Sequence, residues 1–133
     1  SNGVAAHIDY RGYIGFGSPL LERYRSADCF VLPSWHEGFP HAIWEAASCG
    51  TPIVVTPVGG IPGIVTDQEV RFVKVKSVES LVEGIVDTLV NSEQAFERAN
   101  KVYELAGTYT IESCAKVLAQ HLSRDEVSKR QEK

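Results

Sequence analysis

The fold class is decided by residues 29–57, CFVLPSWHEGFPHAIWEAASCGTPIVVTP. Two runs in this stretch, CFVLPS and PIVVTP, are apolar almost throughout, which is typical of strands covered on both faces of a parallel sheet. Between them lies a helical pattern that begins near Pro40, buries Ile43, Ala46 and Ala47, and ends at a glycine. A strand, a helix and a second strand in this order predict a βαβ unit.

The same alternation continues on both sides of this unit. Two more β-type runs are AAHIDYRG before it and RFVKV after it, and Ser18 and Pro19 open a helix that runs to about residue 27. Ser77 caps a long helix, and further helices are expected over residues 93–106 and 111–122. The apolar residues of the long helix recur at helical spacing: Leu81, Ile85, Val86 and Leu89. The predicted class is α/β with a parallel sheet.

Size and composition favour one soluble domain. A chain of 133 residues can bury one core but is too short for two domains, and its 44% hydrophobic and 23% charged content is that of an ordinary globular protein. The net charge of −4 and the scattered cations argue against nucleic acid as a partner. No apolar run approaches the ~20 residues that span a bilayer. Residues 124–133 read as a charged, fraying tail, so the domain is expected over residues 4–123.

The three cysteines predict neither a disulfide framework nor a metal site. Cys29, Cys49 and Cys114 are odd in number and form no CxxC pair. We expect them to be buried small hydrophobic residues in a reducing compartment. No set of histidines, cysteines and carboxylates has metal-ligand spacing, so no metal is expected.

Candidate binding residues gather where the first strand of residues 29–57 passes through a Gly/Pro turn into the helix. The free N–H groups of a helix N-terminus attract anionic phosphates, and His41 and Ala42 lie in its first turn. Gly38 and Phe39 can also offer main-chain N–H groups, whereas Pro40 has none. The two carboxylates of this stretch, Glu37 and Glu45, would repel a phosphate, so sugar hydroxyls are their natural partners.

The wider block, residues 32–65, closely resembles the nucleotide-sugar-binding half of GT-B retaining glycosyltransferases of family 4. The resemblance is carried by the E-x7-E spacing of Glu37 and Glu45 within EGFP, EA and CGTPIV, followed by VGG-P, and it covers roughly residues 6–120. It implies a Rossmann-like parallel sheet flanked by helices, as part of the C-terminal, donor-binding domain. The family's upstream Arg/Lys pair and its acceptor-binding domain have no counterpart here. The chain is therefore expected to be a fragment that is inactive by itself.

The resemblance also implies roles for single residues. Glu37 would contact the donor sugar near the reacting centre as the catalytic residue, and Glu45 would accept hydrogen bonds from the ribose hydroxyls. A fully helical span of eight residues would rise ~12 Å, which suits a sugar at one end and a nucleoside at the other. The full predicted donor-binding set is Glu37, Gly38, Phe39, Pro40, His41, Ala42, Glu45, Gly59 and Gly60. Three simpler interpretations stay open: a solvated Glu45, a helix-entry role for Glu37, and a tight turn at Gly59 and Gly60.

Other residues near the motif receive no chemical role. His36 and His41 invite a general-base role, but retaining enzymes of this fold are thought to lack a protein base. Trp35 and Trp44 are expected to be packing anchors. The family often has glutamate where Gly63 stands, and its Gly-rich loop is replaced by DQEVR, which leaves Arg71 as an unexpected cation near the cleft.

The predicted function is retaining glycosyl transfer from a nucleotide-diphospho-sugar, with a UDP-sugar favoured over a GDP-sugar and no further cofactor. The acceptor would be bound by an N-terminal domain outside this chain, in a cytoplasmic protein peripheral to the cytoplasmic membrane face. An exposed sheet edge near Ile8 predicts self-association. The alternative is a non-catalytic nucleotide-sugar-binding or assembly module. A phosphate-binding receiver domain is disfavoured because the chain lacks an acidic cluster at its strand ends.

Overall fold

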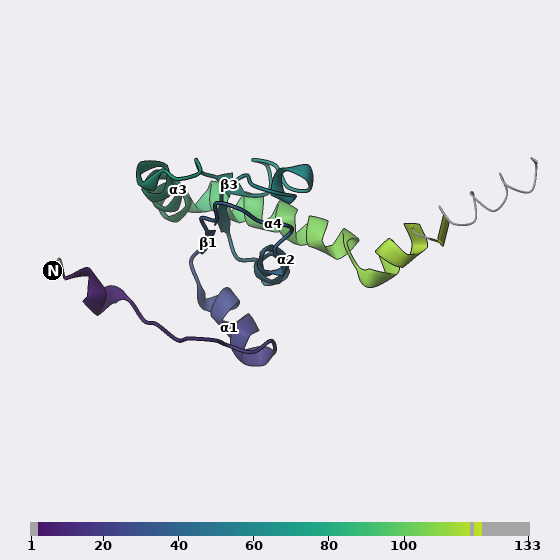
Figure 1. Ribbon diagram of the computed structural model, residues 1–133, viewed down its shortest axis with the longest axis horizontal. Coiled ribbons are helices and arrows are strands. Elements are labelled where there is room, and N and C mark those ends of the chain that lie inside the picture. The colour runs from purple at the N-terminus through teal and green to yellow at the C-terminus, as the bar shows by residue number, and fades with distance from the viewer. Residues whose placement is uncertain (1–2, 118, 121–133) are drawn as a thin grey trace, which may run out of the picture.

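The computed structural model of the chain describes residues 3–117, 119 and 120. Helices and strands alternate along it (Figure 1), in an order that ends with two long helices. The elements are η1 (Val4–His7), α1 (Ser18–Ser26), β1 (Phe30–Leu32), α2 (His41–Ser48), β2 (Ile53–Val55), η2 (Ile61–Gly63), β3 (Arg71–Phe72), α3 (Val78–Val90) and α4 (Ser92–Thr108). Residues 111–117, 119 and 120 are also helical. The described helices include none with the length and apolarity that crossing a bilayer requires.

The three strands form one parallel sheet in the order β1-β2-β3. Phe30 of β1 lies opposite Ile53 of β2, and Val54 lies opposite Arg71 of β3. Because α2 connects β1 to its parallel neighbour β2, the predicted βαβ unit is confirmed, and so is the α/β class.

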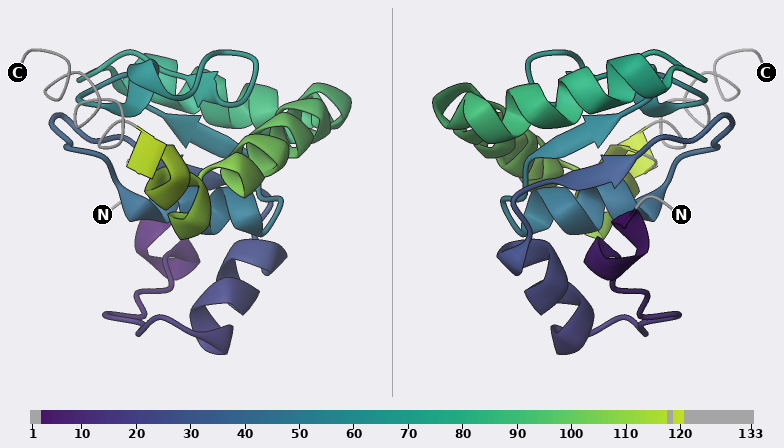
Figure 2. Two further views of the ribbon diagram at one scale, coloured as in Figure 1. Left: turned by 90° about the vertical axis from the view of Figure 1, so that its right-hand side faces the viewer. Right: turned by 90° about the vertical axis from the view of Figure 1, so that its left-hand side faces the viewer.

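Helices cover the central strand β2 on both faces. Ile53 and Val55 belong to the buried core that α2 and α4 share, together with Ile43 and Val102. Val54 points to the other face, where it packs against α3: a Cβ added to Gly84 of α3 would lie 3.4 Å from the Val54 Cγ1. Figure 2 shows the strands between α3 and α2. This burial on both faces explains why β2 is apolar throughout.

Local signals set the helix boundaries that were predicted. Pro19 lies in the first turn of α1, whose Leu20 and Tyr24 are half-buried. Ser77 caps α3 because its side-chain oxygen accepts a hydrogen bond from the Ser80 N–H at 3.1 Å. The buried face of α2 consists of the three predicted residues, Ile43, Ala46 and Ala47.

The strand predicted near Ile8 does not form. Residues 4–7 are a 3-10 helix and residues 8–17 have no regular structure, with Ile8 66% and Tyr10 90% exposed. In Figure 1 the purple chain before α1 runs outside the sheet. A strand needs a neighbouring backbone to bond, and the described chain supplies none for this segment. The open sheet edge therefore belongs to β1 and not to Ile8.

The buried face of α3 differs from its apolar stripe, and the predicted burial of the cysteines needs correction. On α3, Val86 and Leu89 are about half exposed, and the residues that turn inward are Gly84 and Thr88. The small inner residues let the helix lie close to the sheet, which leaves the outer valines uncovered.

The cysteines are less buried than predicted: Cys114 is exposed, while Cys29 and Cys49 are only half-buried. Burial raises the pKa of the Cys29 thiol, with a smaller contribution from Asp28. Residue 118 and the tail over residues 121–133 lie outside the described chain.

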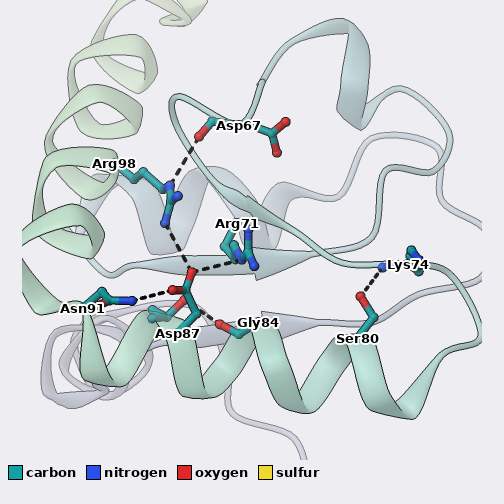
Figure 3. A network of polar contacts seen from close by, with 9 residues as sticks. Asp67, Arg71, Lys74, Ser80, Gly84, Asp87, Asn91 and Arg98 are labelled. Atoms are coloured by element: carbon teal, nitrogen blue, oxygen red, sulfur yellow. Dashed lines mark hydrogen bonds and ion pairs between the residues drawn. The ribbon is translucent and has the colours of Figure 1, made fainter.

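Arg71 joins a structural network rather than the predicted cleft (Figure 3). Its Nε lies 3.2 Å from Asp87 Oδ2 without the alignment of a hydrogen bond, so the contact is an ion pair. Asn91 donates to Asp87 Oδ1 at 2.6 Å, and Arg98 lies 4.0 Å from Asp87 while donating to the Asp67 carbonyl. The network ties β3 to α3 and α4.

Candidate functional site

The candidate site is built from two loops that leave the carboxyl ends of β1 and β2. In parallel sheets ligands bind at this end of the strands. The Gly60 N–H donates to the Gly38 carbonyl at 2.8 Å, and Thr56 Oγ1 donates to the Ser34 carbonyl at 2.6 Å. The loop over residues 34–40 and the loop over residues 56–60 therefore lie side by side.

Gly59 makes the closest approach between the loops. A Cβ added to it would lie 1.9 Å from the Glu37 carbonyl oxygen, and its φ of +59° is one that side-chain-bearing residues rarely adopt. A Cβ added to Gly60 would lie 2.9 Å from the Gly38 carbonyl oxygen. The tight turn at Gly59 and Gly60 is confirmed, and it packs against the loop of Glu37; the donor-binding role of the pair remains a prediction.

Glu37 is half-buried and held by a nearby hydroxyl. Ser34 Oγ donates to Glu37 Oε1 at 2.6 Å, a short charge-assisted hydrogen bond. The helix-entry interpretation loses support, because α2 begins at His41 and has no acidic residue in its first turn. Glu37 is positioned instead by Ser34 on one side and Gly59 on the other.

The N-terminus of α2 carries no side-chain cap. Its N-cap residue is Pro40, and no side chain bonds the first-turn N–H groups. The His41 and Ala42 amides thus lie at the positive end of the helix with no capping partner among the described side chains. The His41 side chain is exposed, and Phe39 is half-buried beside Gly60.

Glu45 is a half-buried carboxylate with a partner from another helix. The Tyr24 hydroxyl of α1 donates to Glu45 Oε2 at 3.0 Å. Burial, and next the bond to Glu45, raise the pKa of Tyr24 to about 12, so the phenol stays protonated and remains a donor. Thr51 fixes this turn of α1 by donating to the Tyr24 carbonyl at 2.7 Å. The structure thus shows Glu45 bonded and half-buried rather than fully solvated, and the ribose role remains a prediction.

The two tryptophans behave differently. Trp44 packs between Phe39 and Tyr109, with ring centroids 5.4 and 5.0 Å away, which confirms it as a packing anchor. Trp35 is 59% exposed, so the same prediction for it is wrong. Its ring instead lies 4.7 Å from the Lys76 ammonium, close enough for a cation–π contact.

The structure brings most predicted residues together and adds two. Glu37, Gly38, Phe39 and the Gly59 turn share the loop contact, whereas Glu45 lies farther along α2 beside α1. Sequence reasoning missed Ser34, although a hydroxyl three residues before a carboxylate was a usable signal. It also missed Tyr24, which no local pattern connects to α2. Within the described residues, no group of three histidines, cysteines or carboxylates is placed to hold a metal.

Comparisons with known proteins show the family to which the chain is related. Residues 2–106 match the family model described as glycosyl transferases group 1. A D-inositol 3-phosphate glycosyltransferase of Mycobacteroides abscessus is 38% identical over 81 residues, which cover 60% of this chain and 18% of that protein. The chain thus spans about a fifth of that relative's length.

Two solved structures share the fold. The C-terminal domain of the group 1 glycosyl transferase LpcC from Francisella tularensis superposes with a TM-score of 0.65 at 26% identity, covering 74% of this chain and 51% of that one. Sucrose-phosphate synthase from Thermosynechococcus elongatus gives a TM-score of 0.69 at 23% identity, covering 80% of this chain and 27% of that one. The chain therefore belongs to the glycosyl transferases group 1 family and has the parallel α/β fold of GT-B glycosyltransferases.

Proposed function

We propose that this chain carries the donor-binding site of a retaining glycosyltransferase that uses a nucleotide-diphospho-sugar. One observation carries the proposal: the loop of Glu37 is held between Ser34 and Gly59, directly before a helix N-terminus that no side chain caps. The loop holds a carboxylate in place for sugar hydroxyls, and the helix offers amides to a diphosphate.

Each part of the donor has a matching group. The diphosphate lies on the His41 and Ala42 amides, where the helix dipole favours anions. The sugar lies against Glu37 and the backbone of Gly38, beside the wall formed by Gly59 and Gly60. Glu45 accepts hydrogen bonds from the ribose through the oxygen that Tyr24 does not bond. Phe39 and Pro40 shape the turn between sugar and diphosphate.

The transfer follows the retaining course that the family resemblance implies. The bond between the anomeric carbon and the diphosphate oxygen breaks, and the acceptor oxygen forms its bond on the same face of the sugar. The acceptor's proton passes to the leaving phosphate, so neither His36 nor His41 acts as a base. Glu37 acts by orienting the sugar and stabilising the positive charge that develops on its ring.

The remaining features of the parent protein belong to the same proposal. A UDP-sugar is favoured over a GDP-sugar, and the acceptor is bound mainly by a domain that this chain does not contain. The isolated chain is then a fragment without turnover, from a cytoplasmic protein at the membrane face. The open edge of β1 is the surface through which it would self-associate, which light scattering tests directly.

Calorimetry with UDP-glucose and GDP-mannose, on this chain and on its full-length parent, tests the donor site. Glu37→Ala and Glu45→Ala should each lose about 1.5–3 kcal/mol of binding, or roughly ten- to a hundredfold in affinity, because each removes a charge-assisted hydrogen bond. Glu97→Ala, an exposed glutamate of α4, is the matched control. Unchanged affinity and turnover in both site variants would remove the basis of the proposal.

A second candidate is a non-catalytic nucleotide-sugar-binding or assembly module. Gly63 motivates it, because this exposed position at the end of η2 lacks the glutamate that the family resemblance would lead one to expect there. The two candidates differ in turnover by the full-length parent: a binding module would bind the donor in calorimetry but release neither nucleotide nor a new glycoside.

A further inference from the structure

A cavity adjoins the candidate site on the α3 side of the sheet. It has a volume of about 260 Å³ and opens at the carboxyl ends of the strands. Its walls are mainly apolar, formed by Trp35, Val73, Val78 and Leu81, with Pro33 at one side. None of the residues assigned to the donor belongs to it.

Two lysines supply the charge of this cavity. Lys74 and Lys76 both line it, and neither forms an ion pair within the described part of the chain. No acidic residue of the described chain lines it, and Glu79 accepts a hydrogen bond from Ser77, which is a lining residue. The cavity is therefore complementary to an anion.

The backbone holds Lys76 in an unusual conformation. Its φ is +60°, and it is the non-glycine residue of positive φ in the described chain. A side chain in this region strains the backbone locally. The conformation lets the ammonium lie 4.7 Å above the Trp35 ring, so an exposed aromatic face and a cation meet at the rim of the cavity.

The hydroxyls of the cavity are already in use. Thr56 Oγ1 donates to the Ser34 carbonyl, and Ser77 Oγ donates to Glu79 while accepting from the Ser80 N–H. A sugar would bring hydroxyls that find few partners here, and unpaired polar groups are costly to desolvate. Apolar walls beside two lysines that form no ion pair among the described residues suit an anionic head on an aliphatic body instead.

The position of the cavity connects it to the donor site. Trp35 lies two residues before Glu37, and Thr56 bonds the carbonyl of Ser34, whose hydroxyl holds Glu37. We propose that this cavity binds a phosphate ester of an aliphatic alcohol, with the phosphate at Lys74 and Lys76 and the chain against Trp35. Resting on the proposed function, this ester is the acceptor, or the carrier of the acceptor, next to the reacting sugar.

Titration of the chain with hexyl phosphate, followed by the two tryptophan indole signals in ¹H–¹⁵N NMR, tests the proposal. Trp35→Phe assigns the signals. The Trp35 signal should shift saturably while that of Trp44 stays in place. Inorganic phosphate, hexanol and glucose 6-phosphate should each bind at least about tenfold more weakly. Hexanol lacks the phosphate, and the other two lack the aliphatic chain. Equal binding of hexyl phosphate and glucose 6-phosphate would overturn the aliphatic assignment.

Variants of Lys76 distinguish the loss of its charge from a loss of the fold. Lys76→Asn removes the ammonium but suits a positive φ, and it should weaken hexyl phosphate binding about fivefold or more. Lys76→Arg should retain binding, and Lys101→Gln, at a distant lysine of α4, should leave it unchanged. Unaltered affinity in Lys76→Asn, with the fold verified by circular dichroism, would overturn the site.

The same samples separate this inference from the proposed function. Glu45→Gln should weaken binding of uridine diphosphate and leave hexyl phosphate binding intact. Nucleotide binding without hexyl phosphate binding would refute the cavity alone. Hexyl phosphate binding without nucleotide binding would refute the donor site alone.

Discussion

Replacing Gly59 with alanine tests the contact that joins the two loops of the site. The new methyl group would lie 1.9 Å from the Glu37 carbonyl oxygen, and the backbone would keep a φ of +59°. The positive φ costs about 1–2 kcal/mol, and forcing atoms into a packed contact costs about 1–3 kcal/mol more. The loss of unfolded-state entropy returns about 0.4–1 kcal/mol. We expect a net loss of about 1–4.5 kcal/mol in the free energy of unfolding.

Urea denaturation measures this loss, and two other glycines separate its causes. Gly50 has a φ of +70° with open space around it, so Gly50→Ala should show the cost of strain alone, a net ~0.5–1 kcal/mol. Gly63 has open space and no positive φ, so Gly63→Ala should be neutral or slightly stabilising. If Gly59→Ala were no more destabilising than Gly50→Ala at the same m-value, the close contact with Glu37 would be refuted.

Three further changes test single bonds. Burial, and next the bond to Glu45, raise the pKa of Tyr24, and this contributes stability that is full below pH 10 and is lost as pH rises through about 12. Tyr24→Phe should flatten this loss in unfolding curves between pH 9 and 12, and an equal slope would contradict the raised pKa of this phenol. Ser77→Ala removes the cap of α3 and should lower the free energy of unfolding by about 1 kcal/mol, whereas no change would mean that the cap is replaced. Asp87→Asn should cost about 0.5–1 kcal/mol through its pair with Arg71, less in 1 M salt, and a salt-independent loss would argue against an ionic origin.

The sequence predicted best where local signals and tertiary packing agree. The helix α2, its three buried residues and the strands on either side follow from periodicity and flanking turn residues. The helix cap at Ser77 could also be predicted from the sequence, because a cap depends on residues only a few positions apart. The meeting of the two loops followed from the rule that parallel strands present their carboxyl ends at one edge.

The failures came from contacts that no local pattern records. The run near Ile8 has strand-like residues, but a strand needs a neighbour, and none lies beside it in the described chain. The bond from Tyr24 to Glu45 joins separate helices, and the Lys76 ammonium over Trp35 depends on how β3 leads into α3. The apolar periodicity predicted the helix α3 but did not show which residues it buries, because the small residues Gly84 and Thr88 are the ones that face the sheet and Val86 is exposed.

The crossover topology has a consequence for how the chain folds. Among the described strands none pairs with a neighbour through a hairpin, since α2 separates β1 from β2, and η2 with its loop separates β2 from β3. Each pairing must therefore close a long loop, at a cost in chain entropy, before any hydrogen bond between the strands can form. This slows folding relative to hairpin-rich sheets. Substitutions that weaken α2 should then retard refolding kinetics as well as lower equilibrium stability, because that helix spans the gap across which the first two strands must meet.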